Sequence, residues 1–166
     1  MPLHIALLEA RSAEITGAVA RRCAAVDASL HLVGPLGFAT DDPAFRSAGP
    51  AAWDAFDWWH HPGWRDFRDA MSRERCLYFA ADAERDPVEA PFKPNSVLVF
   101  GDESLGLPDR IRSKYPDRVF ALPRAARRKE DDFAGAIEAT LAFAAKRTAR
   151  GDAPRERPQR RSRRPR

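Results

Sequence analysis

The chain has only two cysteines and two methionines among its 166 residues, and it has no long apolar run. Cys23 and Cys76 are far apart and each lies in an apolar stretch, so we expect reduced, buried thiols of a cytosolic protein. No Cys-x-x-Cys or His-x-x-x-His spacing is present, which predicts no metal site. No stretch reaches the roughly 18 apolar residues of a membrane span, and the amino terminus does not resemble a signal peptide. We therefore expect a cytoplasmic protein that has no metal and no membrane partner.

Positive charge is concentrated at the carboxyl terminus. Residues 147–166 contain nine arginines and two acidic residues, a net of +7, whereas the whole chain carries +4, so residues 1–146 carry −3. Residues 148–166 have three prolines and no large apolar side chain, and they therefore predict a disordered arginine-rich tail. Such a tail either adds salt-dependent affinity for RNA phosphates or serves only to solubilise the protein.

Residues 1–147 alternate between strand and helix patterns, and a chain of this length allows one compact domain. Strands alternating with helices at this spacing predict an α/β fold whose mostly parallel sheet is covered by helices on both faces. The expected strands span residues 3–8, 30–33, 76–81, 96–100 and 119–122; the expected helices span 16–26, with Thr16 as the N-cap, 65–72 and about 131–147.

All four tryptophans lie in one short segment, residues 53–64. Exposed aromatic rings beside arginines can stack on unpaired RNA bases. Aromatic rings also pack helices onto sheets or form dimer contacts, and we favour this second interpretation. We expect His60 and His61 to be surface or helix-start residues rather than catalysts.

Ligands of open α/β sheets bind beyond the carboxyl ends of the strands. Two such ends are of interest, residues 100–108, which contain two glycines, and residues 122–124. Neither carries a phosphate-binding GxxxxGK[ST] motif, and no GxGxxG is present. On these residues alone, either turn could hold a ligand or simply connect two elements.

Several segments together resemble one family, in the same order and at nearly the same spacing. This family is the bacterial tRNA (cytidine/uridine) 2′-O-methyltransferases that act at the wobble position, within the SPOUT superfamily. The resemblance covers about residues 3–147. Its residues are Thr16-Gly17 with Arg21 and Cys23, Pro35-Leu36-Gly37-Phe38, Arg46 with Ala48-Gly49, Phe100-Gly101-x-Glu103-x-x-Gly106-Leu107-Pro108, and Leu122-Pro123.

The resemblance implies a homodimer whose carboxy-terminal half forms a trefoil knot. It also implies that the knot loops bind S-adenosyl-L-methionine and that its methyl group passes to a ribose 2′-hydroxyl of RNA, with tRNA as the substrate and without a metal. The implied catalytic residues are Arg21 and Glu103, and the implied cofactor-binding residues are Phe79, Gly101, Leu122 and Glu130.

Both catalytic assignments have alternatives. A guanidinium normally stays protonated, so Arg21 could orient the ribose or a phosphate instead of acting as a base, or it could form a surface salt bridge. Glu103 could be an acidic residue favoured at a helix start by the helix dipole.

The chain also departs from the family pattern, mainly at polar positions. Ile15 and Ala18 replace two asparagines of the first motif, and Leu105 replaces an arginine of the second. The third motif reads Glu-Asp-Asp-Phe-Ala-Gly over residues 130–135, which places Glu130 where the family has a cofactor-binding serine. These departures support a second hypothesis, a catalytically silent SPOUT relative that acts as a dimeric RNA-binding protein.

Overall fold

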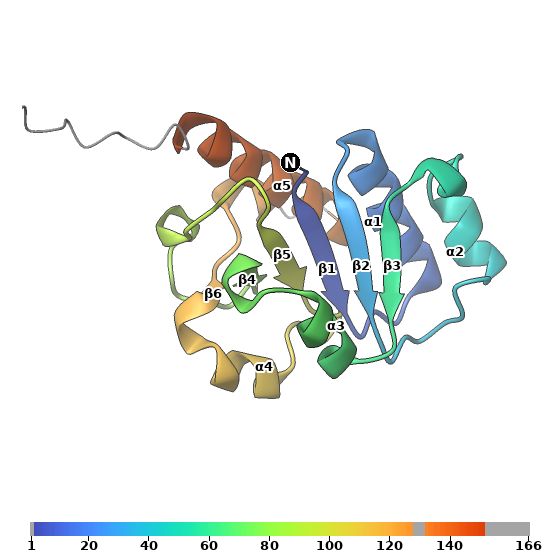
Figure 1. Cartoon of the computed structure of the whole chain (residues 1–166), viewed down its shortest axis with the longest axis horizontal. Helices are drawn as coiled ribbons and strands as arrows, with labels where there is room; N and C mark the ends of the chain where they lie inside the picture. The colour runs from blue at the N-terminus through green and yellow to red at the C-terminus, as the bar shows by residue number, and fades with distance from the viewer. Residues whose placement is uncertain (1, 128–131, 152–166) are drawn as a thin grey trace, which may run out of the picture.

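A six-stranded sheet forms the centre of the molecule (Figure 1). The structure, a computed structural model, describes residues 2–127 and 132–151. The strand order is β3-β2-β1-β5-β4-β6, and all five strand pairs are parallel, as the sequence predicted. The strands are β1 (His4–Leu8), β2 (Ser29–Val33), β3 (Trp58–His61), β4 (Cys76–Phe79), β5 (Val97–Phe100) and β6 (Val119–Phe120).

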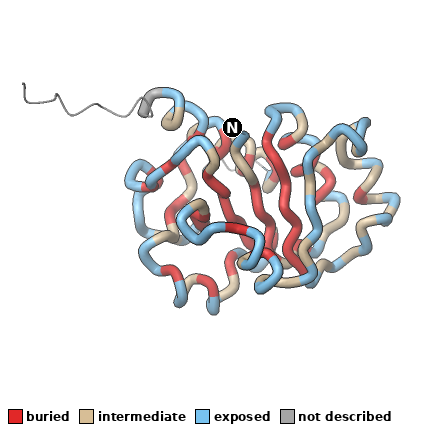
Figure 2. Tube along the Cα trace, in the orientation of Figure 1, coloured by how far each residue is buried: buried red, intermediate tan, exposed pale blue. Residues whose placement is uncertain are grey.

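Helices cover both faces of the sheet, which confirms the predicted layers (Figure 1). Side chains alternate along each strand, so that Ile5 and Leu7 join the core on one face, whereas Ala6 and Leu8 join the core on the other. Strands β1, β2, β4 and β5 are almost fully buried, whereas the edge strand β3 is partly exposed (Figure 2). Helices α1 (Ala13–Ala25), α2 (Pro43–Ala48) and α5 (Phe133–Gly151) lie on the first face, and α3 (Trp64–Ala70) and α4 (Asp109–Lys114) lie on the second.

Helix α1 begins earlier than the sequence indicated. Ser12 is its N-cap, and the Ser12 hydroxyl accepts a hydrogen bond of 3.2 Å from the amide of Ile15. Thr16 lies inside the helix and is buried. The prediction of Thr16 as N-cap was therefore wrong, because Ser12 already satisfies an amide of the first turn.

The tryptophan segment contains a strand that the sequence did not reveal. Trp58 and Trp59 lie in β3, at the edge of the sheet, together with His60 and His61, so neither histidine starts a helix. Trp53 and Trp58 pack around Phe45 of α2, as the packing interpretation predicted. The remaining two differ from each other: Trp64 packs on Phe67, Tyr78 and Tyr115, whereas Trp59 is 44% exposed and stacks on His31.

Helix α5 extends through Gly151. The expected start of the tail at residue 148 was therefore wrong, since residues 148–151 are helical, and residues 152–166 lie outside the described part. Cys23 and Cys76 are both buried and free, as expected. Within residues 2–127 and 132–151, no helix has the length and apolar character needed to cross a membrane, and no group of three potential metal ligands occurs.

Candidate functional site

The loop between β5 and α4 closes tightly on itself at the carboxyl edge of the sheet. A Cβ atom at Gly101 would lie 2.0 Å from the carbonyl carbon and oxygen of Gly106 and 2.4 Å from the amide nitrogen of Leu107. The Gly106 amide donates a hydrogen bond of 2.9 Å to the carbonyl of Asp102, and Gly106 has a φ of +70°. Only glycine at position 101 allows the two ends of this loop to approach so closely.

Asp102 organises the inside of the same loop. Its Oδ2 atom accepts hydrogen bonds from the amides of Ser104 (3.0 Å) and Leu105 (2.9 Å) and from the Ser104 hydroxyl (2.6 Å). These bonds hold the backbone so that the Leu105 side chain points outward, 72% exposed. Asp102 was not among the predicted site residues, although an aspartate two residues before a serine in a glycine-flanked turn is a typical Asx-turn pattern.

Glu103 links this loop to the start of α1. Its Oε1 atom accepts a hydrogen bond of 2.9 Å from the amide of Ser12, although the two residues are 91 positions apart in the sequence. The ion pair between Arg110 of α4 and Glu9 joins the same two segments. The predicted site residue Glu103 therefore lies at the carboxyl edge, between the ends of β1 and β5, and Ser12 is its partner that sequence analysis missed.

The two carboxyl groups of Asp102 and Glu103 have opposite pKa shifts. Burial raises the pKa of Glu103, and the neighbouring Asp102 carboxylate raises it further. Burial acts in the same direction on Asp102, but the hydrogen bonds from Ser104, the neighbouring Glu103 carboxyl and the Leu105 amide outweigh it and hold the pKa of Asp102 below its usual range. The Oδ1 atom of Asp102 and the Oε2 atom of Glu103 are buried, and neither has a hydrogen-bond donor among the described residues.

The ends of β4 and β6 carry two of the predicted cofactor residues. The Phe79 side chain is buried and stacks with the rings of Phe92 and Phe100, so only its backbone can face a ligand. The Leu122 side chain is half-buried beside the core, and its carbonyl accepts a hydrogen bond of 2.7 Å from Nε of Arg127. The three predicted residues thus lie at the ends of adjacent strands along one edge of the sheet. Phe79 ends β4, Gly101 follows β5, and Leu122 lies two residues after β6.

Arg21 lies apart from this group. It is exposed on α1, and it has no hydrogen bond or ion pair with any described residue. At 1.5 Å per residue, nine residues along the helix place Arg21 about 13 Å from Ser12 and its contact with Glu103. The structure of a single chain therefore does not bring the two predicted catalytic residues together.

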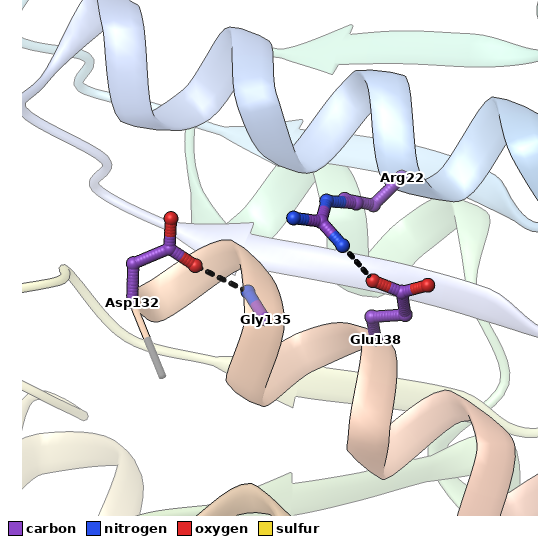
Figure 3. Close-up of polar contacts among 4 residues, drawn as sticks. All are labelled: Arg22, Asp132, Gly135 and Glu138. Atoms are coloured by element: carbon purple, nitrogen blue, oxygen red, sulfur yellow. Dashed lines mark hydrogen bonds and ion pairs between the residues drawn. The ribbon is translucent and has the colours of Figure 1, made fainter. Parts of the chain in front are cut away.

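Only residues 132–135 of the third motif lie in the described part of the chain, at the start of α5. Asp132 accepts a hydrogen bond of 2.7 Å from the amide of Gly135, and Arg22 of α1 forms an ion pair with Glu138 of α5 (Figure 3). The Phe133 ring lies against Phe100, 6.4 Å between ring centroids. Asp132 thus stabilises the first turn of α5, whereas the predicted cofactor residue Glu130 lies outside the described residues.

A cavity of about 910 Å³ lies at the opposite end of the strands. Residues that precede β1 and β2 line it, together with residues of α1 and α5, for example Leu3, Ala28, Val26, Leu141 and Ala145. Ligands of parallel α/β sheets bind at the carboxyl ends of the strands, so this cavity is not the candidate cofactor site.

Comparison with known proteins shows the family. Residues 2–127 match the model of the SpoU rRNA Methylase family. The chain belongs to this family. It is 33% identical over 143 residues, 83% of this chain and 87% of the relative, to a tRNA (cytidine(34)-2′-O)-methyltransferase of Acidovorax sp. (strain JS42). It is 30% identical over 145 residues, 84% of this chain and 90% of the relative, to the enzyme of that name from Yersinia pestis.

Solved structures agree with the family and the fold. One, described as structural insights into the 2-OH methylation of C/U34 on tRNA, is 29% identical, has a TM-score of 0.75, and is matched over 89% of this chain and 91% of that chain. The SpoU methyltransferase AviRb from Streptomyces viridochromogenes, in complex with AdoMet, has the same TM-score of 0.75 at 19% identity over 90% of this chain and 59% of that one. The second similarity supports the SpoU-type fold alone.

Proposed function

We propose that this member of the SpoU family is an S-adenosyl-L-methionine-dependent methyltransferase that modifies a ribose 2′-hydroxyl of tRNA. The observation that carries the proposal is the loop from Gly101 to Pro108 at the carboxyl edge of the sheet. Its tight turn requires Gly101, and it keeps Glu103 in contact with the first turn of α1. Relatives that share most of the length of this chain are named tRNA (cytidine(34)-2′-O)-methyltransferases, which supports the same reaction here.

The ends of three neighbouring strands suit an adenosyl group. Leu122 offers a partly exposed apolar side chain, and the backbone at Phe79, Gly101 and Leu122 offers amides and carbonyls along one edge. S-adenosyl-L-methionine, when bound, supplies the electrophilic methyl group. The role of this chain is then to hold the methyl acceptor close and aligned, since alignment contributes much of the rate of such a transfer. Glu130 remains a proposed cofactor contact.

We propose that Arg21 binds the ribose or an adjacent phosphate. Its guanidinium is exposed, and a guanidinium keeps its proton at neutral pH. Because Arg21 is about two and a half helical turns from the Glu103 contact, it would complete the site more easily from a second copy of the chain. This spacing supports the proposed homodimer, in which Arg21 of one protomer approaches the Glu103 loop of its partner.

The trefoil knot and the location are also proposals. The chain leaves the far edge of the sheet at β6 and then places α5 against the core beside α1, which is compatible with a knotted carboxy-terminal half (Figure 1). Because tRNA is the proposed substrate, we propose that the protein works in the cytoplasm.

The decisive experiment combines cofactor binding with product mapping. Calorimetry should detect saturable binding of S-adenosyl-L-methionine, and incubation with cofactor and tRNA should yield a 2′-O-methylated ribose that mass spectrometry locates. Arg21→Ala should abolish most of the methylation while leaving cofactor binding intact, and Arg65→Ala, a change of an exposed arginine on α3, is the matched control. Absence of cofactor binding with and without tRNA would reject the enzyme, and salt-dependent tRNA binding in the same samples would then support the catalytically silent relative.

A further inference from the structure

Two residues that are neighbours in the β5–α4 loop each have one buried carboxylate oxygen that has no hydrogen-bond donor among the described residues. These oxygens are Oδ1 of Asp102 and Oε2 of Glu103. The other oxygen of each group is already engaged: Oδ2 of Asp102 accepts three hydrogen bonds within the loop, and Oε1 of Glu103 accepts one from the Ser12 amide. Two adjacent carboxylates, both ionised and with their free oxygens buried, would repel each other and lack hydration.

One proton removes both the repulsion between the carboxylates and the lack of a hydrogen-bond donor. We infer that the carboxyl groups of Asp102 and Glu103 share a single proton, which Glu103 donates to Asp102, and that Asp102 is thereby a positioning residue for the site. With that proton in place, Oε2 of Glu103 becomes a donor and Oδ1 of Asp102 becomes its acceptor, so that every oxygen of the pair has a partner. Each of the two carboxyl groups shifts the pKa of the other, as expected for neighbouring groups that interact.

The surroundings decide which group keeps the proton. Asp102 receives three donors at one oxygen, and hydrogen bonds to the charged form favour ionisation. Glu103 receives a single amide, that of Ser12, and faces the Asp102 charge. The nearby ion pair of Arg110 with Glu9 is already neutralised and lies on the exposed side, so it gives Glu103 no free cation. The opposite pKa shifts of the two carboxyls agree with this assignment.

The shared proton has a structural consequence for the site. Glu103 then bridges three elements: Asp102 within its own loop, Ser12 at the start of α1, and, through that loop, the end of β5. A protonated Glu103 cannot accept the proton of a ribose hydroxyl, so its contribution to the proposed methyl transfer, on which this part of the inference rests, is to hold two edge loops together. The contact weakens when the pH rises through the pKa of Glu103.

The test needs neither cofactor nor RNA. The carboxyl carbon of Glu103, assigned by its loss in Glu103→Gln, is followed by NMR against pH in the full chain labelled with 13C-glutamate. We expect it to titrate above the ordinary glutamate range of about 4.3. In Asp102→Asn the amide can donate to Glu103, so the same carbon should titrate lower than in the wild type. A wild-type Glu103 that titrates at or below the ordinary range, or an unchanged pKa in Asp102→Asn, would overturn the inference.

A second measurement exploits the shape of glutamine. In Glu103→Gln, the new amide side chain can accept from the Ser12 amide and donate to Asp102 at every pH, as a permanently protonated Glu103 would. Urea unfolding should therefore show wild type and Glu103→Gln equally stable below the ordinary glutamate pKa of about 4.3, where Glu103→Ala should be less stable than both. The Glu103→Gln variant should become more stable than the wild type as the pH rises from there through the pKa of Glu103 in the folded chain. A Glu103→Gln variant that is as unstable as Glu103→Ala at all pH values would also refute the shared proton. If the titration holds but tRNA is not methylated, only the proposed function fails.

Discussion

The guanidinium of Arg46 lies over the ring of Trp53, 5.0 Å from its centroid, and the indole Nε1 of Trp53 donates a hydrogen bond of 3.0 Å to the Arg46 carbonyl. Arg46 also lies over Trp58 and donates from Nε to the Thr40 carbonyl at 2.7 Å. One arginine thus connects α2 with η1 (Trp53–Ala55) and with the edge strand β3. A residue that resembles part of a family motif therefore stabilises the fold in this chain.

We predict that Arg46→Ala lowers the free energy of unfolding by about 1–3 kcal/mol, because it removes the cation–π contacts and the hydrogen bond to Thr40. Arg46→Lys should lower the free energy of unfolding by less, since lysine keeps the charge over the rings, although it lacks the planar donor group. Urea denaturation monitored by tryptophan fluorescence measures both values. Equal stability of Arg46→Ala and the wild type would show that these contacts contribute nothing net.

Gly101→Ala tests the tight turn of the site. The added Cβ would meet the backbone of Gly106 at 2.0 Å, so the loop must move, and we expect a loss of stability on the order of 2–4 kcal/mol together with weakened cofactor binding. Gly63→Ala is the matched control, because its Cβ would meet only a side-chain oxygen of Asp66 at 3.7 Å. Thermal unfolding and calorimetry of the two variants compare them directly, and indistinguishable behaviour would contradict the steric argument.

The histidine row on the second face predicts sensitivity to acid. His31 donates to or accepts from His4 (2.8 Å) and His61 (3.0 Å) and stacks on Trp59. Burial, followed by the neighbouring His4 and His61, lowers the pKa of His31 to about 3, well below the value of 6.5 expected in the unfolded chain. The unfolded chain therefore binds a proton that the folded chain does not between these two values, and stability falls as the pH drops below 6.5, by about 1.4 kcal/mol per pH unit for one such proton.

Replacing this histidine should flatten the acid dependence. In His31→Gln, the free energy of unfolding should fall less steeply between about pH 6.5 and about pH 4 than in the wild type, even if the variant is less stable at neutral pH. His60→Gln, at an exposed position of β3, should retain the wild-type slope. Denaturant unfolding at a series of pH values gives all three slopes, and a wild-type slope in His31→Gln would show that His31 is not the responsible group.

Deleting residues 152–166 tests the arginine-rich tail while preserving α5, which ends at Gly151. If the tail binds RNA phosphates, tRNA affinity should fall, and the slope of log affinity against log salt should decrease by about 0.7–0.9 for each lost phosphate contact. A full-length variant with lysines in place of the tail arginines should keep most of that slope. Filter binding at several salt concentrations measures these values, and an unchanged slope after truncation would favour a purely solubilising tail.

The buried strands could be predicted because the apolar composition of each segment is enough to indicate them. Residues 3–8, 30–33 and 96–100 are mostly apolar on both faces of a parallel sheet, so the apolar run is nearly continuous and does not depend on which neighbour each strand finds. The edge strand β3 was missed for the opposite reason. Its sequence, Trp-Trp-His-His, has no period of two, and it is a strand because it pairs with β2. The short helices α2 and α4, six residues each, likewise carry too few residues for a periodic signal.

The sequence by itself determined the α/β class, the buried strands and the glycine-containing turn at residues 101–106, because hydrophobic runs and backbone-permissive residues act locally. Tertiary structure alone decided that Ser12 meets Glu103 across 91 positions and that the free oxygens of Asp102 and Glu103 are both buried. It also placed Arg21 about two and a half helical turns from that contact. Such relationships depend on which strands lie side by side and on how much water remains between the loops, and neither quantity is encoded in any short segment of the chain.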